Sequence, residues 1–288
     1  MGNRKANNQS THMCDGQKSY IPYKALNEFL RELEEKTKGV DFQRNMMVFR
    51  GQRNSTFPPV PSLFRKNFAI SEYQIINDAV CIRPDEFNKC QNTFEILLTL
   101  QHYQIPTRLL DCTTNPLIAL FFACYEEHPK ETDVDASVNI YLVPNNRIFF
   151  WNDKAVDEML NFAIRPDWDT IDVENTQLPE HMRKARLRPE DVILVKPRAL
   201  NPRIAFQQGM FFLPGQPIPN PVDKEVKNND LRDNKKSFLR AYEKTVIKIK
   251  ASDIPDLFKD LSLLGIQEYS VYPELTHFES FIPKAKIK

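Results

Sequence analysis

The residues best suited to chemistry lie in one stretch, residues 101–125, with the sequence QHYQIPTRLLDCTTNPLIALFFACY. His102, Arg108 and Asp111 bring an imidazole, a guanidinium and a carboxylate together within ten residues. A loop that carries these three groups is a candidate functional site. A structural interpretation is also open, in which Arg108 and Asp111 form an internal ion pair that fixes the loop.

Two predicted helices flank this loop and would position it. The apolar spacing of residues 94–101 predicts a helix that leads into His102 and ends by Ile105, because the residue before Pro106 is pushed out of the α region. Asn115 followed by proline indicates a second helix start. The sequence after it, LIALFFACY, is apolar nearly all round, so we expect that helix to be buried. Polar groups held between buried helices are typical of a functional site.

The composition is that of a globular chain able to bury a sizeable core. It has 288 residues, 41% hydrophobic and 27% charged. With only 7 Gly, it contains no GxGxxG or GxxxxGK[ST] phosphate-binding motif. The net charge of +1 predicts no global attraction to nucleic acid or anionic membranes. We expect a disordered polar tail at residues 1–18 and a single domain at residues 19–288.

Cysteine usage and the apolar runs suggest a reduced cytoplasmic compartment. The five cysteines include no CxxC pair and no histidine at ligand spacing, so neither a disulfide framework nor a zinc site is expected. The chain opens with no secretory signal, and its apolar runs are too short to span a bilayer. We therefore expect no membrane partner and no bound metal.

Strands and helices are predicted without regular βαβ alternation, which favours an α+β fold with a mixed sheet and flanking helices. Residues 145–190 could be an insertion into this core, and residues 214–235 are predicted to be a mobile loop. Strands are expected at 46–51, 138–143, 191–196, 211–213 and 245–250, and further helices at 23–38, 71–80, 154–162, 179–186 and 252–264.

Two strand ends carry further candidate residues. The first predicted strand stops at Arg50 and Gly51, where glycine would free the backbone and arginine would project from the end. Arg50 could equally be a structural arginine tied to backbone carbonyls. The segment NPRIAFQQGMFF brings Arg203 and two amides before a glycine. Of these amides, Gln208 could reach a ligand or could simply satisfy the backbone at a strand end.

Taken together, the motifs resemble the FRG domain family. They are FRG at residues 49–51, then QHYxxPTRLLDxTxNPLxALFFA, and later NPRIAFQQGMFF and GIQEYSVYPEL. The resemblance extends over roughly residues 45–280, in order. The family is similar in outline to the ADP-ribosyltransferase fold, in which a first-strand arginine followed by glycine helps bind NAD and a late acidic residue assists transfer. The resemblance thus implies NAD as substrate and a cofactor-binding role for Arg50 and Gly51.

Cleavage of the nicotinamide–ribose bond passes through an oxocarbenium-like transition state, as glycoside cleavage does. Under this hypothesis Arg50 binds the pyrophosphate, because guanidinium binds phosphate bidentately. Tyr103 would support nicotinamide, and His102 would bond to a ribose hydroxyl. The essential carboxylate is either Asp111 or Glu274. For Glu274 a structural interpretation is favoured, as a helix-start residue after proline; His102 at a helix end could also be structural.

The sequence therefore leaves several function classes open. The first is an ADP-ribosyltransferase-like enzyme or NAD glycohydrolase, acting as a toxin or phage-defence effector. The second is a non-catalytic module whose same cleft binds a nucleotide-derived ligand or a protein partner. A nuclease is disfavoured because no paired carboxylates stand at metal-binding spacing. The sequence identifies neither the acceptor, which could be protein, nucleic acid or a small molecule, nor the oligomeric state.

Overall fold

The computed structural model describes residues 20–65, 72–125, 134–165, 177–215, 239 and 242–274. The predicted tail at residues 1–18 lies outside these ranges. So do residues 216–235 of the predicted loop 214–235, of which only 214 and 215 are described.

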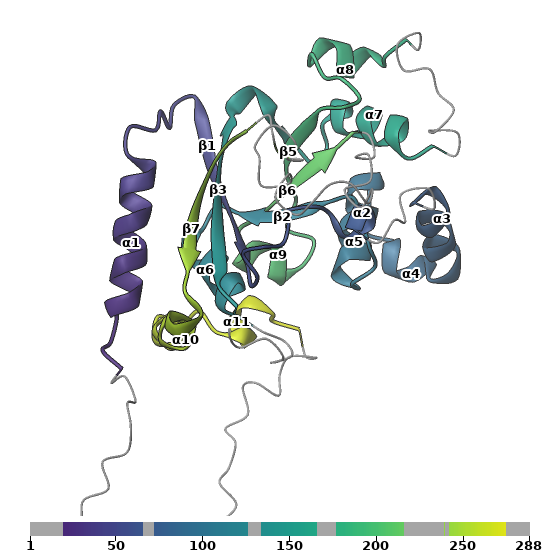
Figure 1. Cartoon of the computed structure of the whole chain (residues 1–288). Helices are drawn as coiled ribbons and strands as arrows, with labels where there is room; N and C mark the ends of the chain where they lie inside the picture. Colours follow the sequence, from purple (N-terminus) through teal and green to yellow (C-terminus); the bar gives the residue numbers. More distant parts are fainter. Residues whose placement is uncertain are drawn as a thin grey trace, which may run out of the picture.

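A seven-stranded mixed sheet forms the centre of the fold, with the strand order β4-β5-β6-β2-β1-β3-β7 (Figure 1). Strands β4 and β5 run parallel, and the other neighbouring pairs are antiparallel. The five strands expected from the sequence are present as β1, β3, β5, β6 and β7. The bounds are β1 Asn45–Gln52, β2 Leu110–Thr113, β3 Ala136–Pro144, β4 Ile148–Phe150, β5 Val192–Lys196, β6 Gly209–Pro214 and β7 Glu243–Ile249.

The helices do not alternate regularly with the strands, and the α+β class predicted from the sequence is confirmed. No helix in the described parts of the chain is long and apolar enough to cross a membrane. The α-helices are α1 Lys24–Thr37, α2 Ser62–Arg65, α3 Glu72–Ile82, α4 Pro84–Phe87, α5 Thr93–His102, α6 Pro116–Cys124, α7 Lys154–Ala163, α8 Glu180–Lys184, α9 Pro202–Phe206, α10 Ile254–Leu263 and α11 Glu268–Val271. Short 3-10 turns occupy η2 Asn145–Arg147 and η4 Ala251–Asp253.

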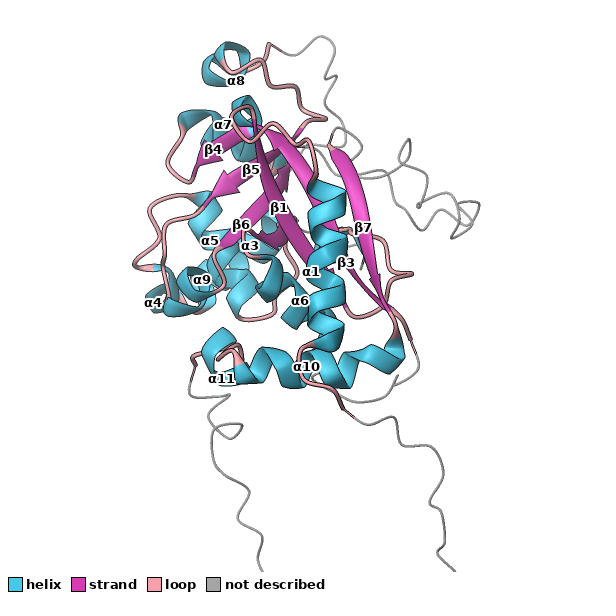
Figure 2. Cartoon of the chain, turned by 90° about the vertical axis from the view of Figure 1, so that its left-hand side faces the viewer, coloured by secondary structure: helices cyan, strands magenta, loops and turns pink. Residues whose placement is uncertain are grey.

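Two groups of helices cover the sheet and leave β2 between them. Helices α1, α6 and α10 lie near β1, β3 and β7 (Figure 2). Together these elements form one core, in which Phe49 and Ile140 are buried. Helices α5 and α7 form a second core with β5 and β6, which includes Phe211. Register pairs Phe49 with Thr113, and Asp111 with Phe211. Because side chains alternate along a strand, Asp111 shares a face of the sheet with both cores.

Helix α6 is the central buried helix, and its start follows the sequence prediction. Asn115 is the N-cap, and its side chain accepts hydrogen bonds from the backbone N–H groups of Leu117 and Ile118. Pro116 takes the first helical position, where its missing N–H costs nothing. Most of the helix is buried, as the all-round apolar sequence predicts.

Gly51 is required by the packing of α6 and not by a strand end. Strand β1 continues through Gly51 to Gln52, with Gly51 paired to Val138 of β3. A Cβ atom at Gly51 would lie 1.9 Å from the carbonyl oxygen of Ala119 and 2.7 Å from the nitrogen of Ala123. The expectation that glycine frees the backbone where the strand stops is therefore wrong. The glycine lets α6 approach the strand.

The central loop predicted around Arg108 and Asp111 is shorter than expected. Residues Leu110–Thr113 form strand β2, which pairs with both β1 and β6. Asp111 is therefore a strand residue with a fixed position. The segment 145–190, predicted as an insertion, supplies β4 to the sheet edge and α7 to the second core.

Candidate functional site

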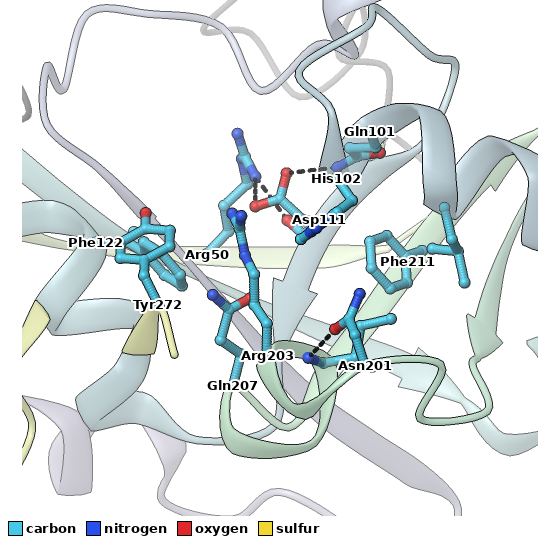
Figure 3. Close-up of a pocket in the computed structure, with 13 residues that line it drawn as sticks. Arg50, Gln101, His102, Asp111, Phe122, Asn201, Arg203, Gln207, Phe211 and Tyr272 are labelled. Atoms are coloured by element: carbon cyan, nitrogen blue, oxygen red, sulfur yellow. Dashed lines mark hydrogen bonds and ion pairs between the residues drawn. The ribbon is translucent and has the colours of Figure 1, made fainter. Parts of the chain in front are cut away.

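A pocket of about 270 Å³ opens on the helix-bearing face, where the two helix groups meet above β2 (Figure 3). Its lining combines charged and amide side chains with aromatic rings. The polar groups are Arg50, Gln101, His102, Asp111, Asn201, Arg203 and Gln207, and the rings are Phe122, Phe211 and Tyr272. The lining residues come from β1, β2, β6 and three helices, and Tyr272 directly follows α11. Concave sites in which aromatic rings and converging polar groups meet are typical places for small molecules to bind.

An ion pair between neighbouring strands lies at the centre of the pocket. Arg50 donates through Nη1 to the backbone carbonyl of Asp111 at 2.6 Å, and the same nitrogen lies 2.9 Å from Asp111 Oδ2. Gln101 Nε2 donates to Asp111 Oδ1 at 3.4 Å. Partial removal from water raises the pKa of Asp111. The charges of Arg50 and Arg203 and hydrogen bonds outweigh this effect, so the pKa is lowered overall. Asp111 is thus an anion at neutral pH.

Arg203 is a second cation in the pocket. It lies in the first turn of α9, which Asn201 caps by accepting from the N–H of Ile204 at 3.0 Å. Its guanidinium carbon stands 4.6 Å from the centre of the Tyr272 ring, within cation–π range. Arg65 of α2 is nearby: desolvation and the like charge of Arg50 lower the pKa of Arg65. Arginines from three elements therefore surround the single aspartate.

His102 and Glu274 form the remaining polar pair. His102 Nδ1 lies 3.6 Å from Glu274 Oε1, too far for a hydrogen bond. Both carboxylate oxygens of Glu274 are buried and have no hydrogen-bond partner among the described residues, and the same holds for His102 Nδ1. A buried carboxylate without partners is costly to fold. Each such group needs a physical explanation, and a role in binding or catalysis is one of them.

Most of the residues predicted for the site gather here. Arg50, Gly51, His102 and Asp111 line the pocket, although Arg50 and Asp111 are 61 residues apart in the sequence. Glu274 stands against His102.

Arg108 does not belong to this pocket, and the expectation that it shares a wall with Asp111 is wrong. Its side chain is 1% exposed and forms a bidentate ion pair with Glu72 of α3. It also donates to the backbone carbonyls of Ala163, Pro214 and Gly215, at 3.0 to 3.1 Å. Arg108 and Asp111 therefore form no internal pair either. Arg108 is a buried cross-link between α3, α7 and the end of β6.

Tyr103 and Gln208 also lie outside the pocket lining. Tyr103 is half exposed, and its hydroxyl bonds to Glu86 of α4. Gln208 has a φ of 47°, and its amide oxygen accepts from the Thr114 hydroxyl at 3.3 Å. Its neighbour Gln207 lines the pocket instead. The aromatic platform predicted at Tyr103 and the ligand-binding amide predicted at Gln208 therefore do not line the pocket.

The aromatic rings and Gln207 were missed by the sequence reasoning. Gln207 donates to the carbonyl of Val271 at 3.0 Å, which ties α9 to the residues around Tyr272. One signal in the sequence could have located Gln207. Asn201-Pro202 repeats the Asn-Pro helix start of α6, and from a start at Pro202 the residues 203 and 207 lie four apart on one helix face.

No group of three or more His, Cys, Asp or Glu side chains that could hold a metal ion occurs in the ranges that the structure describes.

Comparison with known families places the first half of this pocket in a recognised domain. Residues 45–132 match the FRG domain. The match includes β1, β2, α5 and α6 and ends before residue 201, so the expected likeness of NPRIAFQQGMFF and GIQEYSVYPEL falls outside it. No curated protein and no solved structure matches the chain. The chain therefore contains an FRG domain at residues 45–132, with Arg50 and Gly51 on its first strand and Asp111 on its second.

Proposed function

We propose that the pocket binds NAD and cleaves its nicotinamide–ribose bond, so that ADP-ribose passes to water or to an acceptor. The observation that carries this proposal is Glu274, a buried carboxylate without a hydrogen-bond partner among the described residues. It stands 3.6 Å from His102, which lines the pocket. Support also comes from the FRG motif pattern, which is similar in outline to the ADP-ribosyltransferase fold.

The reaction breaks the bond between ribose C1′ and nicotinamide N1, and the electron pair leaves with neutral nicotinamide. The ribose then carries oxocarbenium-like positive charge, which a nearby carboxylate stabilises. Glu274 is placed for this role because, among the described residues, no cation lies within hydrogen-bond distance of its carboxylate. Glu274 would next accept the proton of the attacking water or acceptor group, and His102 would orient the carboxylate.

Asp111 is less suited to this role, because Arg50 already neutralises it at 2.9 Å. The more consistent assignment makes Asp111 the residue that holds Arg50. Arg50 uses Nη1 for both of its contacts with Asp111, so Nη2 remains available to a ligand oxygen. Tyr272, Phe122 and Phe211 offer ring faces and edges for a flat, cationic nicotinamide.

The test is release of nicotinamide from NAD by the purified full chain, with and without a cell lysate as source of acceptor. Glu274→Gln keeps the size of the side chain and removes its charge. We expect it to lower the rate at least about 100-fold, as loss of transition-state charge stabilisation does. Glu190→Gln, at an exposed position, is the matched control and should leave the rate unchanged. If wild type releases no nicotinamide and labels no product in either condition, the enzyme proposal is wrong.

As an NAD-consuming effector, of toxin or phage-defence type, the protein would arrest the growth of bacteria that express it. Glu274→Gln should relieve the arrest at equal protein level. Arg108→Ala is not a useful probe here, because Arg108 is part of the buried framework and its loss would act through folding.

A non-catalytic module that binds the same ligand is the second candidate function. The neutralised Arg50–Asp111 pair favours it, since this pair can orient a ligand without reacting. Ligand binding that is as strong in Glu274→Gln as in wild type, combined with no turnover, would support this candidate.

A further inference from the structure

Arg203 is the second arginine that lines the pocket. It donates no hydrogen bond and forms no ion pair within the described residues, and it lines the pocket beside Tyr272. We propose that Arg203 binds a phosphate of the ligand, so that the pocket is specific for ligands that carry a diphosphate. This inference deepens the proposed function, on which it rests for the identity of the ligand but not for the anion-binding role.

The position of Arg203 is fixed before any ligand arrives. Its helix begins at Pro202, and the Asn201 side chain caps the first turn. The guanidinium lies over the Tyr272 ring, 4.6 Å from its centre, and the two groups approach from α9 and from the residue after α11 (Figure 3). A guanidinium held on an aromatic face loses little side-chain entropy on binding, and its planar edge still offers donors to an oxyanion.

The balance of charge in the lining also points to an anion. Two arginines and one aspartate line the pocket, and Arg50 and Asp111 neutralise each other at 2.9 Å. Arg203 is left as the lining arginine without an ion pair within the described residues. Arg65 adds positive charge from the side of α2, close enough to Arg50 for their charges to interact. An unpaired cation in a partly desolvated pocket is stabilised by a bound phosphate, with which a guanidinium forms bidentate, charge-assisted hydrogen bonds.

A structural role is the alternative, in which Arg203 serves only to hold the Tyr272 ring. The two roles differ in their response to salt. An arginine that contacts phosphate contributes an electrostatic term that salt screens, whereas an arginine that only supports a ring does not.

The test is calorimetric titration with ADP-ribose, which contains the diphosphate and, lacking nicotinamide, is not turned over. Arg203→Ala should weaken binding at least about tenfold, the loss expected for a hydrogen-bonded charge. Arg44→Ala removes the same charge from an exposed side chain near the start of β1 and should leave the affinity unchanged. Arg203→Lys should fall between wild type and Arg203→Ala, because it keeps the charge and loses the planar fork.

The titrations are repeated from about 50 mM to about 500 mM NaCl. We expect wild-type affinity to fall with salt, and the slope to be smaller for Arg203→Ala. Weaker binding with an unchanged slope would mean that Arg203 only supports Tyr272, and it would overturn the inference. Unaltered affinity in Arg203→Ala, or failure of wild type to bind ADP-ribose, would overturn it equally.

Failure of the inference and failure of the proposed function give different results. If ADP-ribose binds through Arg203 and NAD is not cleaved, the anion site stands and the enzyme proposal falls. If NAD is cleaved and Arg203→Ala binds ADP-ribose as wild type does, the enzyme proposal stands and the assignment of Arg203 falls.

Discussion

Arg50 Nη1 contacts both oxygen types of Asp111, the carbonyl at 2.6 Å and the carboxylate at 2.9 Å. The two residues lie on the adjacent strands β1 and β2, so a side-chain pair reinforces the strand pairing at the centre of the sheet. The same contact lowers the pKa of Asp111 and so favours its charged form.

The Asp111 pair should make stability depend on pH in acid. The pKa of Asp111 is lowered on folding from its usual 3.8. Its stabilisation is therefore present above that value and is lost as the pH falls through the lower value of the folded state. Urea denaturation from about pH 3 to about pH 6 should show wild type more stable than Asp111→Asn at the upper end, and the difference should shrink below about pH 4. We expect a small effect, because the side chain is 53% exposed and solvent screens it. A difference in the free energy of unfolding between wild type and Asp111→Asn that is constant with pH would contradict the lowered pKa of Asp111.

Gly51 should tolerate no side chain. In Gly51→Ala the new Cβ meets backbone atoms of α6 at 1.9 and 2.7 Å, so the helix must shift. We expect the free energy of unfolding to fall by about 1–3 kcal/mol, the range for overpacking. Gly209→Ala is the matched control on β6, since its Cβ would make ordinary contacts at 3.7 Å or more. Thermal and chemical denaturation of both variants checks the difference, and equal stability of the two would refute the packing argument.

Arg108→Ala should be one of the most destabilising single substitutions in this chain. It leaves the Glu72 carboxylate buried without its partner, and breaking a buried pair in this way costs roughly 3–5 kcal/mol. Replacement of both partners, as Arg108→Met with Glu72→Leu, should cost less than the single change, because no buried charge remains unpaired.

Arg83→Ala is the control for this pair. It breaks an exposed ion pair with Glu86 and should alter stability by less than about 0.5 kcal/mol. A similar small effect for Arg108→Ala would show that Arg108 is not a structural cross-link.

The two adjacent glutamines should respond differently to substitution. Gln207 lines the pocket and bonds to the Val271 carbonyl at 3.0 Å, so Gln207→Ala should weaken ADP-ribose binding severalfold, as loss of about one hydrogen bond does. Gln208 lies outside the lining, and Gln208→Ala should leave the affinity unchanged. Calorimetric titration distinguishes them. The reverse ranking would restore Gln208 as the ligand-binding amide.

The local patterns of the sequence were sufficient for the elements that hold the site. The spacing around His102 predicted the end of α5, and Asn115-Pro116 predicted the start of α6, because caps and proline act within a few residues. Strand β2 was not predicted. It has only four residues, and its stability comes from pairing on both sides with distant strands.

Partners far apart in sequence explain the misassigned residues. Arg108 was interpreted through its neighbour Asp111, whereas its partner Glu72 lies on a helix 36 residues earlier. The platform was assigned to Tyr103 because it adjoins His102, whereas Tyr272 reaches the pocket from the other end of the chain. Gln208 was preferred over Gln207 because it directly precedes Gly209, whereas in the structure Gln208 takes a φ of 47° and Gln207 lines the pocket. Neither the composition nor the periodicity of the sequence shows which residues far apart in the chain come into contact.

The pocket draws on two parts of the chain that meet at the pairing of β2 with β6. The FRG segment contributes Arg50 and Asp111 to the pocket, whereas Arg203, Gln207 and Tyr272 follow residue 200. Two proteins could therefore share the first part and differ in the second. Such proteins would place their ligands at the same point of the sheet and still select different molecules. Grouping of chains by the shared segment alone would then assemble a family with one architecture and several substrate preferences.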